Sequence, residues 1–234
     1  MIARFTTREF IMKKSSFAAT ALALVALGTM SAHAAPQPHL ASWEIAGQFH
    51  ATQNPFEVWT YGYKAAADCN GALIPFSNKT TQTFGSNIND WWMKGTTTGS
   101  QDLPMVGQSK GVTSVSPLKF SPNGITMHPG PSGECAVVRF TAPIKGAYRL
   151  TGRFWAQNIT AGGTNSRPMV VVQNNISTPI AAGNVTAPAG TTNLPFNGSV
   201  ALAAGDTIDF MVGSNGSFLN DSTGLHGFIM RMEQ

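Results

Sequence analysis

The stretch AAGDTIDFMVGSNGSFLNDSTGLHGFIMRM, residues 203–232, decides the fold. Apolar side chains occupy every second position of residues 207–212, which is the period of a β-strand with one buried face. Ala-Gly-Asp at 204–206 is a turn signal, because Gly accepts a positive φ and Asp can bond its own backbone. A polar loop at 213–224 leads into a second alternating run at 226–232. This pattern predicts the end of an antiparallel β-sandwich.

The alternation in these two strands also predicts which side chains enter the core. The predicted core residues are Phe210, Val212, Phe228 and Met230. Asp209 alternates outward, and we expect it to solubilise a sheet edge. Met211 and Ile229 lie opposite the predicted core faces and are apolar, so we expect both faces to be partly covered.

Short strands and turn clusters continue through the rest of the chain. The clearest candidates lie at 43–49, 58–63, 136–140 and 148–155. Pro-Gly-Pro-Ser-Gly at 129–133 is a turn cluster before the third of these. We find no amphipathic helix in the sequence after its first 34 residues. The pattern predicts an all-β, antiparallel two-sheet sandwich of jelly-roll type with about ten to twelve strands.

The first 34 residues have the features of a signal peptide. Lys13 and Lys14 form a basic segment, residues 17–27 are apolar, and Ala-His-Ala at 32–34 is a small-residue cleavage site. The apolar run is shorter than the ~20 residues that a transmembrane helix needs. Met12 is an alternative start. We therefore expect a signal peptide at 1–34 and one β-sandwich domain at 35–234, secreted or periplasmic and without a membrane span.

Removal of this leader changes the charge of the chain. It holds four of the 15 basic residues and one of the 11 acidic residues, so the formal net charge falls from +4 to +1. The remaining sequence has no basic run of the kind that nucleic-acid binding requires. We expect no nucleic-acid partner.

Cys69 and Cys135 are the two cysteines of the chain. Export to an oxidising compartment allows them to pair, and we predict a disulfide between them. The alternative is two separate buried thiols. A metal site at these residues is not expected, because no CxxC or HxxxH spacing accompanies them.

Three stretches together resemble a domain of exported bacterial proteins that include PEP-CTERM proteins and planctomycete surface proteins. They are NPFEVWTYGY at 54–63, HPGPSGECAVVRFTAPIKGAYRLTGRFW at 128–155 and AGDTIDFMVGSNGSFLNDSTGL at 204–225. The resemblance implies a jelly-roll sandwich similar to galactose-binding-like and carbohydrate-binding modules. It implies no defined activity.

The chain departs from that resemblance at two places. Similar proteins often have an Asp-Phe pair where this sequence has Gln48-Phe49, which weakens a shared carboxylate site. PEP-CTERM proteins end in a Pro-Glu-Pro motif, an apolar helix and a basic tail, whereas this sequence ends at Gln234 after a predicted strand. We therefore expect free export without a sorting anchor.

Aromatic side chains provide the candidate ligand-binding residues, because an aromatic ring can stack against the apolar face of a sugar. The candidates are Tyr61, Tyr63, Trp91, Trp92 and Trp155. The alternative is that all five pack in the core, where large aromatic residues are common. In the Trp91-Trp92 pair, strand geometry turns one ring inward and the other outward.

His128 is a further candidate as a ligand contact, and the alternative is a strand-end histidine bonded to the backbone. Asp221 and Asn220 could contribute oxygens to a structural Ca²⁺ site, since calcium takes six to eight oxygen ligands. The loop has one carboxylate and no DxDxDG spacing, so an Asx turn is the alternative.

Export, low charge, aromatic strands and the resemblance together predict a secreted, non-catalytic protein that binds extracellular or cell-envelope carbohydrate. The alternative is a structural or matrix protein of the cell surface without a sugar site. A polysaccharide-active enzyme is less expected, because the sequence has no HExxH motif and its carboxylates are scattered. The sequence predicts no catalytic residue.

Overall fold

The computed structural model describes residues 41–80, 91–96, 103–109, 114–121, 124–188 and 193–232. All of these residues belong to one compact unit. The predicted signal peptide at 1–34 lies outside the described residues, so it stays a prediction. No helix in the described ranges is long and apolar enough to cross a membrane.

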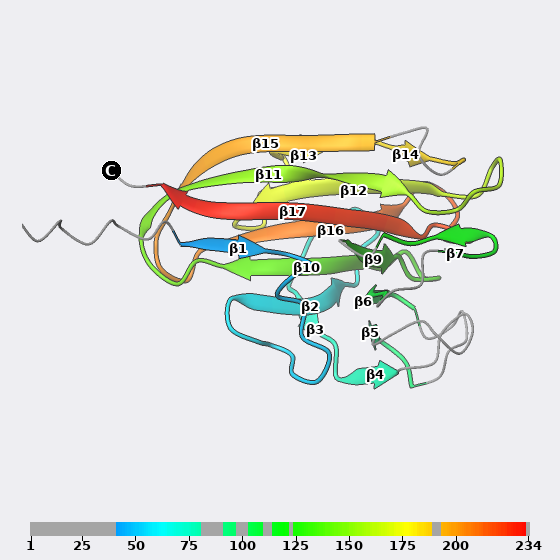
Figure 1. The fold of residues 1–234 in the computed structure, drawn as a ribbon, viewed down its shortest axis with the longest axis horizontal. Helices are drawn as coiled ribbons and strands as arrows, with labels where there is room; N and C mark the ends of the chain where they lie inside the picture. Colours follow the sequence, from blue (N-terminus) through cyan, green and yellow to red (C-terminus); the bar gives the residue numbers. More distant parts are fainter. Residues whose placement is uncertain are drawn as a thin grey trace, which may run out of the picture. The chain divides into compact units, whose positions relative to one another are not determined.

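Two antiparallel sheets make up most of this unit (Figure 1). Sheet A has the order β15-β11-β17-β9-β6-β5-β4, and β1 also pairs with β17. Its strands are β1 (Ser42–Glu44), β4 (Asn78–Thr80), β5 (Trp91–Met93), β6 (Met105–Gln108), β9 (Ile125–His128), β11 (Gly146–Ala156), β15 (Asn193–Leu202) and β17 (Thr223–Met232).

Sheet B has the order β13-β12-β16-β10-β2-β3, and β14 also pairs with β12. Its strands are β2 (Trp59–Lys64), β3 (Ile74–Pro75), β10 (Cys135–Thr141), β12 (Asn165–Val172), β13 (Ala181–Ala182), β14 (Val185–Thr186) and β16 (Thr207–Ser214). A separate hairpin joins β7 (Ser114–Val115) to β8 (Leu118–Lys119).

The long strands of the second half of the chain alternate between the sheets. β10, β12 and β16 lie in sheet B, whereas β11, β15 and β17 lie in sheet A. Such crossing is characteristic of jelly-roll sandwiches. The prediction of an all-β, antiparallel two-sheet sandwich is therefore confirmed. Among the described strands, twelve have three or more residues and five have two.

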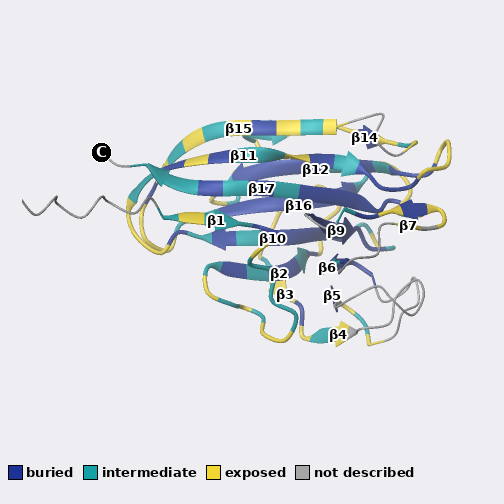
Figure 2. Cartoon of the chain, viewed as in Figure 1, coloured by how far each residue is buried: buried dark blue, intermediate teal, exposed yellow. Residues whose placement is uncertain are grey.

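The main core lies between the two sheets and is rich in aromatic rings. Figure 2 marks the buried residues of the strands in dark blue. Phe140 on β10 is central to it. Its ring centroid lies 5.5 Å from that of Trp59 on β2 and 5.7 Å from that of Tyr148 on β11. Phe210 on β16 similarly lies 5.4 Å from Phe196 on β15. The contact between Phe140 and Trp59 lies within sheet B, whereas those of Phe140 with Tyr148 and of Phe210 with Phe196 join the two sheets.

A second apolar cluster covers the outer face of sheet B. Its buried members are Cys69, Cys135, Val137, Met169, Val171 and Met211. Leu73 and Ile176, from loops outside the sheet, pack against it. Sheet B is therefore apolar on both faces, which confirms the expectation of cover on the Met211 side.

The expectation for Asp209 was wrong. Asp209 lies on β16, an interior strand of sheet B, and its side chain is fully buried. Arg139 and Lys64 pair with it there. Alternation alone predicted the correct face, but not the loops that cover that face.

The predicted core register was correct for β16 and wrong for β17. Phe210 and Val212 are buried. Phe228 and Met230 are only half-buried, and Leu225 and Ile229 fill the core instead. Both faces of β17 carry apolar side chains, so the sequence pattern could not decide between two registers that differ by one residue. The strand predicted at 43–49 is also shorter, since β1 ends at Glu44 and a turn follows.

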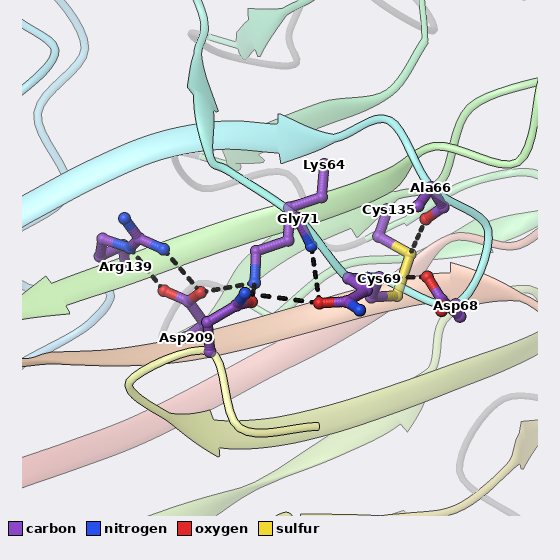
Figure 3. Close-up of polar contacts among 10 residues, drawn as sticks. Lys64, Ala66, Asp68, Cys69, Gly71, Cys135, Arg139 and Asp209 are labelled. Carbon is purple, nitrogen blue, oxygen red and sulfur yellow. Dashed lines mark hydrogen bonds and ion pairs between the residues drawn. A yellow bond between two sulfur atoms is a disulfide. The ribbon is translucent and has the colours of Figure 1, made fainter. Parts of the chain in front are cut away.

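The predicted disulfide is present between Cys69 and Cys135 (Figure 3). It joins the loop after β2 to the first residue of β10, and the two Cα atoms are 5.4 Å apart. Because it closes a separation of 66 residues, the bond restricts the unfolded chain considerably.

Phe210 on β16 and Phe228 on β17 give a matched test of which side chains of these two strands enter the core. We expect F210A to lower the free energy of unfolding by about 3–5 kcal/mol, as in other cores. F228A should cost about 1 kcal/mol, because its half-buried ring leaves no enclosed cavity. Urea unfolding of the two variants measures both values. Equal losses would contradict the register.

The disulfide gives a second test. Thiol titration of the unfolded, unreduced protein should find no free thiol. Replacing both cysteines with alanine should lower the free energy of unfolding by about 4 kcal/mol through the chain entropy of the loop. Two titratable thiols per chain would contradict the bond.

Candidate functional site

Trp155 is the predicted aromatic residue that lies on an outer face of the sandwich. On β11, the buried Phe154 alternates with the half-buried Trp155, which faces away from the core. The indole lies against the backbone of two glycines. A Cβ atom added to Gly224 would lie 2.1 Å from Cε2 of Trp155, and one added to Gly124 would lie 2.5 Å from Cη2. Any side chain at these two positions would displace the ring. The absence of a side chain at Gly224 and Gly124 therefore allows the indole to pack directly on the backbone.

Polar and aromatic side chains continue from Trp155 along the outer face of β11 and β17. The Arg153 guanidinium carbon lies 5.6 Å from the centroid of the Trp155 ring, a cation–π contact. Arg153 is paired in register with His226 on β17. The His226 ring lies 5.0 Å from the ring of Phe228, edge to face.

A carboxylate completes the group. Glu44 on β1 is paired in register with Phe228, and its Oε1 lies 3.7 Å from Nε2 of His226. The side chains of His226 and Glu44 are 31% and 38% exposed, so both are open to a ligand. We call Trp155, Arg153, His226, Phe228 and Glu44 the outer platform.

The outer platform combines groups that suit a polyhydroxylated ligand. The indole and the Phe228 ring offer apolar surfaces on which a sugar ring can stack. Arg153 donates hydrogen bonds and Glu44 accepts them, and the two ring nitrogens of His226 can also form hydrogen bonds. These side chains project from paired strands, so the sheet fixes their relative positions.

The other predicted aromatic residues lie elsewhere. Tyr61 and Trp92 are buried in the main core, where their polar atoms bond to His50: the backbone N–H of His50 donates to the Tyr61 hydroxyl, and the Trp92 indole donates to the His50 carbonyl. Burial raises the pKa of Tyr61 above its usual range. Tyr63 is half-buried and stacks on Phe76 at 5.7 Å. The side chain of Trp91 is outside the described part.

Tyr61 and Trp92 therefore have the alternative role considered for them, core packing. The structure therefore does not bring these two residues together with Trp155. Of the four predicted aromatic residues whose side chains the structure describes, only Trp155 belongs to the outer platform.

His128 is also buried, at 5% exposure. Its Nδ1 donates a hydrogen bond to the carbonyl oxygen of Pro129 at 2.8 Å. Burial lowers the pKa of His128 to about 4, so the ring is neutral at pH 7. This is the strand-end histidine bonded to the backbone that was the alternative to a ligand contact.

Asp221, the predicted calcium ligand, is fully buried two residues before β17 begins. Its Oδ1 accepts the backbone N–H of Asn165 at 2.7 Å, whereas Oδ2 has no hydrogen-bond partner among the described residues. Burial raises the pKa of Asp221 to about 6. Asn220 beside it has a φ of 65°.

In the described ranges, no three His, Cys, Asp or Glu side chains cluster as a metal site would require. The chemistry of one carboxylate with backbone and amide oxygens still suits calcium. The predicted site at Asp221 and Asn220 therefore stays a prediction.

Apart from the outer platform, a pocket lies where three loops meet beyond the end of sheet B. It has a volume of about 490 Å³ and is lined by residues that include Ala67, Pro131, Arg167, Asn215 and Phe218. Arg167 donates through Nη2 to the carbonyl of Ala67 at 2.9 Å, and its Nε is buried without a partner among the described atoms. We call this the loop-end cleft. It contains none of the residues predicted from the sequence as ligand-binding.

Gly107-Gln108-Ser109-Lys110-Gly111 matches the GxSxG spacing of a hydrolase nucleophile elbow. An elbow joins a strand to a helix and exposes the serine. Here Ser109 follows β6 with only 2% exposure, and the next described element is strand β7. The motif therefore lacks the structural context of a nucleophile.

Comparisons with known proteins add similarity of fold alone. No family model matches the chain, and no curated protein matches it. The resemblance to PEP-CTERM and planctomycete proteins therefore stays a prediction. Solved structures with a similar arrangement include carbohydrate-binding modules.

Three solved structures illustrate how weak the similarity is and how varied the matched proteins are. The CBM51 module of a Clostridium perfringens GH95 protein, in complex with methyl-galactose, is 12% identical over 67% of this chain and 94% of its own, with a TM-score of 0.34. The isomalto-dextranase of Arthrobacter globiformis T6, in complex with panose, is 15% identical over 61% of this chain, with a TM-score of 0.32. Pika GITRL is 17% identical over 42% of this chain and 78% of its own, with a TM-score of 0.27. The match covers only 22% of the isomalto-dextranase chain.

The raised pKa of Asp221 predicts a pH-dependent stability difference. Between about pH 4 and 6 the folded protein binds more protons at this carboxyl than the unfolded chain, so the free energy of unfolding falls as pH rises through this range. D221N lacks this titration and keeps an acceptor for Asn165. We expect its stability relative to wild type to increase by about 2–3 kcal/mol from pH 4 to pH 7.5.

The variant D221A is the matched control. It should show the same pH-dependent gain, offset at every pH by a loss of about 1 kcal/mol because the N–H of Asn165 loses its acceptor. Urea unfolding at several pH values measures both variants in the absence of calcium. A pH-independent difference between wild type and D221N would contradict the raised pKa.

Proposed function

We propose that the chain is an exported, non-catalytic protein that binds extracellular or cell-envelope carbohydrate through the outer platform. The observation that carries the proposal is the packing of the Trp155 ring against Gly224 and Gly124 on the outer face of sheet A. This packing fixes the ring before a ligand binds, so binding costs little conformational entropy of the Trp155 side chain.

The side chains near Trp155 favour a neutral or weakly charged sugar as the ligand. Arg153 and Glu44 bring one charge of each sign to the outer platform. A strongly anionic polymer would instead require an excess of basic groups. The mixed polar set suits hydroxyl groups, which both donate and accept hydrogen bonds.

The second candidate is a structural or matrix protein of the cell surface. The half-buried apolar side chains of Phe228 and Met230 on the same face favour it, because they could pack against another protein. The two functions differ in their ligand, so a binding measurement separates them.

Replacement of Trp155 tests the proposal. We expect the protein spanning residues 35–234 to bind a subset of soluble polysaccharides and immobilised oligosaccharides on a glycan array. W155A should weaken that binding by tenfold or more, since loss of a stacked ring removes at least about 1.4 kcal/mol. W155F should retain part of the affinity. I144A is the control, because Ile144 is 45% exposed in the turn before β11.

Melting temperatures of all variants establish that they are folded. If W155A binds as well as wild type while R167A or F218A abolishes binding, the sugar occupies the loop-end cleft and the assignment to the outer platform is wrong. If folded wild-type protein binds no glycan at high concentration, the structural function is favoured.

A further inference from the structure

A lysine, a carboxylate and a side-chain amide meet on the outer face of sheet B, far from the outer platform. Lys64 comes from the end of β2, Asp209 from β16, and Asn174 from the turn after β12. Lys64 Nζ lies 2.8 Å from Asp209 Oδ2, and both side chains are fully buried. Figure 3 shows Lys64 reaching along the sheet toward Asp209. A fully buried lysine is rare unless it has a partner.

The amide of Asn174 is held against the same amine. Lys64 Nζ donates to Asn174 Oδ1 at 2.5 Å, across a sequence separation of 110 residues. Asn174 has a φ of 61°, which turns the chain back over the sheet. Its Nδ2 faces the side chain of Asn70, with 3.4 Å to Oδ1. Both ends of the amide are therefore fixed, and its carbonyl end touches the lysine.

Arg139 fixes the carboxylate. It donates through Nε to Asp209 Oδ1 at 2.6 Å and through Nη2 to Oδ2 at 2.8 Å (Figure 3). This bidentate contact orients Oδ2 toward Lys64. Arg139 is therefore a positioning residue for the pair of Lys64 and Asp209.

We propose that Lys64 and Asn174 join in an intramolecular isopeptide bond, formed by the protein itself with Asp209 as the proton carrier. Asp209 takes a proton from the Lys64 ammonium group, and the neutral amine attacks Cγ of Asn174. A bond forms between Nζ and Cγ, the bond from Cγ to Nδ2 breaks, and Asp209 returns a proton to the leaving nitrogen. An ammonium ion and an amide thereby become a secondary amide and an ammonium ion, with no oxidant or metal required.

The folded protein supplies what this reaction lacks in water. Holding amine and amide in contact replaces a bimolecular encounter with a unimolecular one, and effective molarities of about 10⁵–10⁸ M are known for well-oriented groups. The burial of Lys64 and Asp209 keeps hydrolytic water away from the attacking side. Asn174 also lines a hollow open to solvent, together with Gly71, Arg139 and Thr207, through which ammonia can leave.

The intact mass of the protein tests the proposal directly. After unfolding and reduction of the disulfide, wild-type protein should be lighter than its sequence mass by one ammonia, about 17 Da, the loss that joining amine to amide requires. Trypsin should fail to cut after Lys64, and a branched peptide should contain Lys64 and Asn174. The test needs no carbohydrate, so its outcome is independent of the proposed function.

Three variants distinguish an isopeptide bond from a cluster of charged groups that has only a structural role. K64R and N174A should each have their full sequence mass, because one partner is missing. D209N should form the bond at least tenfold more slowly, or not at all, even if it is folded. I144A again serves as the control and should show the same mass loss as wild type.

A folded wild-type protein that keeps its full sequence mass after prolonged incubation at 37 °C would overturn the proposal. Lys64, Asp209 and Arg139 would then be a buried ion cluster that holds β2, β10 and β16 together.

Discussion

The burial of both faces of sheet B is the constraint on which the rest of the structure depends. Its inner face packs against sheet A through Phe140 and Phe210, and its outer face carries a second apolar cluster. Strands that are apolar on both sides need a cover on each side. The loops between β2 and β3 and between β12 and β13 supply the outer cover, and the disulfide from Cys69 to Cys135 links the first of them to the sheet.

This double burial also explains why charged groups lie inside the protein. Asp209 must point to the outer face of β16, where the cover excludes water. A buried carboxylate is tolerated only when it is paired and hydrogen-bonded. Lys64 and Arg139 provide both conditions, from two neighbouring strands. Replacing either partner alone would remove hydrogen bonds or an ion pair from the buried carboxylate.

The sequence was sufficient for the features that depend on local pattern. The alternation in 207–212 predicted the buried face of β16, and the presence of two cysteines in the predicted exported part predicted their bond. The register of β17 could not be predicted, because Phe228 and Ile229 are both apolar and neighbour each other. Only the pairing of β17 with β11 and β9 decides which of them enters the core.

The candidate site was harder to predict from the sequence, because its residues come from strands that are far apart in the chain. The outward direction of Trp155 follows from the period of two on β11, but its partners come from β17 and β1. His226 and Glu44 lie 182 residues apart in the chain and meet only through strand pairing. Composition likewise cannot separate a stacking tryptophan from a core tryptophan such as Trp92, because the difference lies in which face of sheet A each ring occupies.

The position of β17 has a consequence for the order of folding. This strand comes from residues 223–232, yet it lies inside sheet A, paired with β11 on one edge and with β9 and β1 on the other. Until it is in place, strands formed much earlier in the chain lack their neighbour, so sheet A cannot assemble progressively during synthesis. Long-range pairing of this kind delays the completion of the sheet until β17 is available. In a chain with this topology, sheet A is complete only after residues 223–232 have been synthesised.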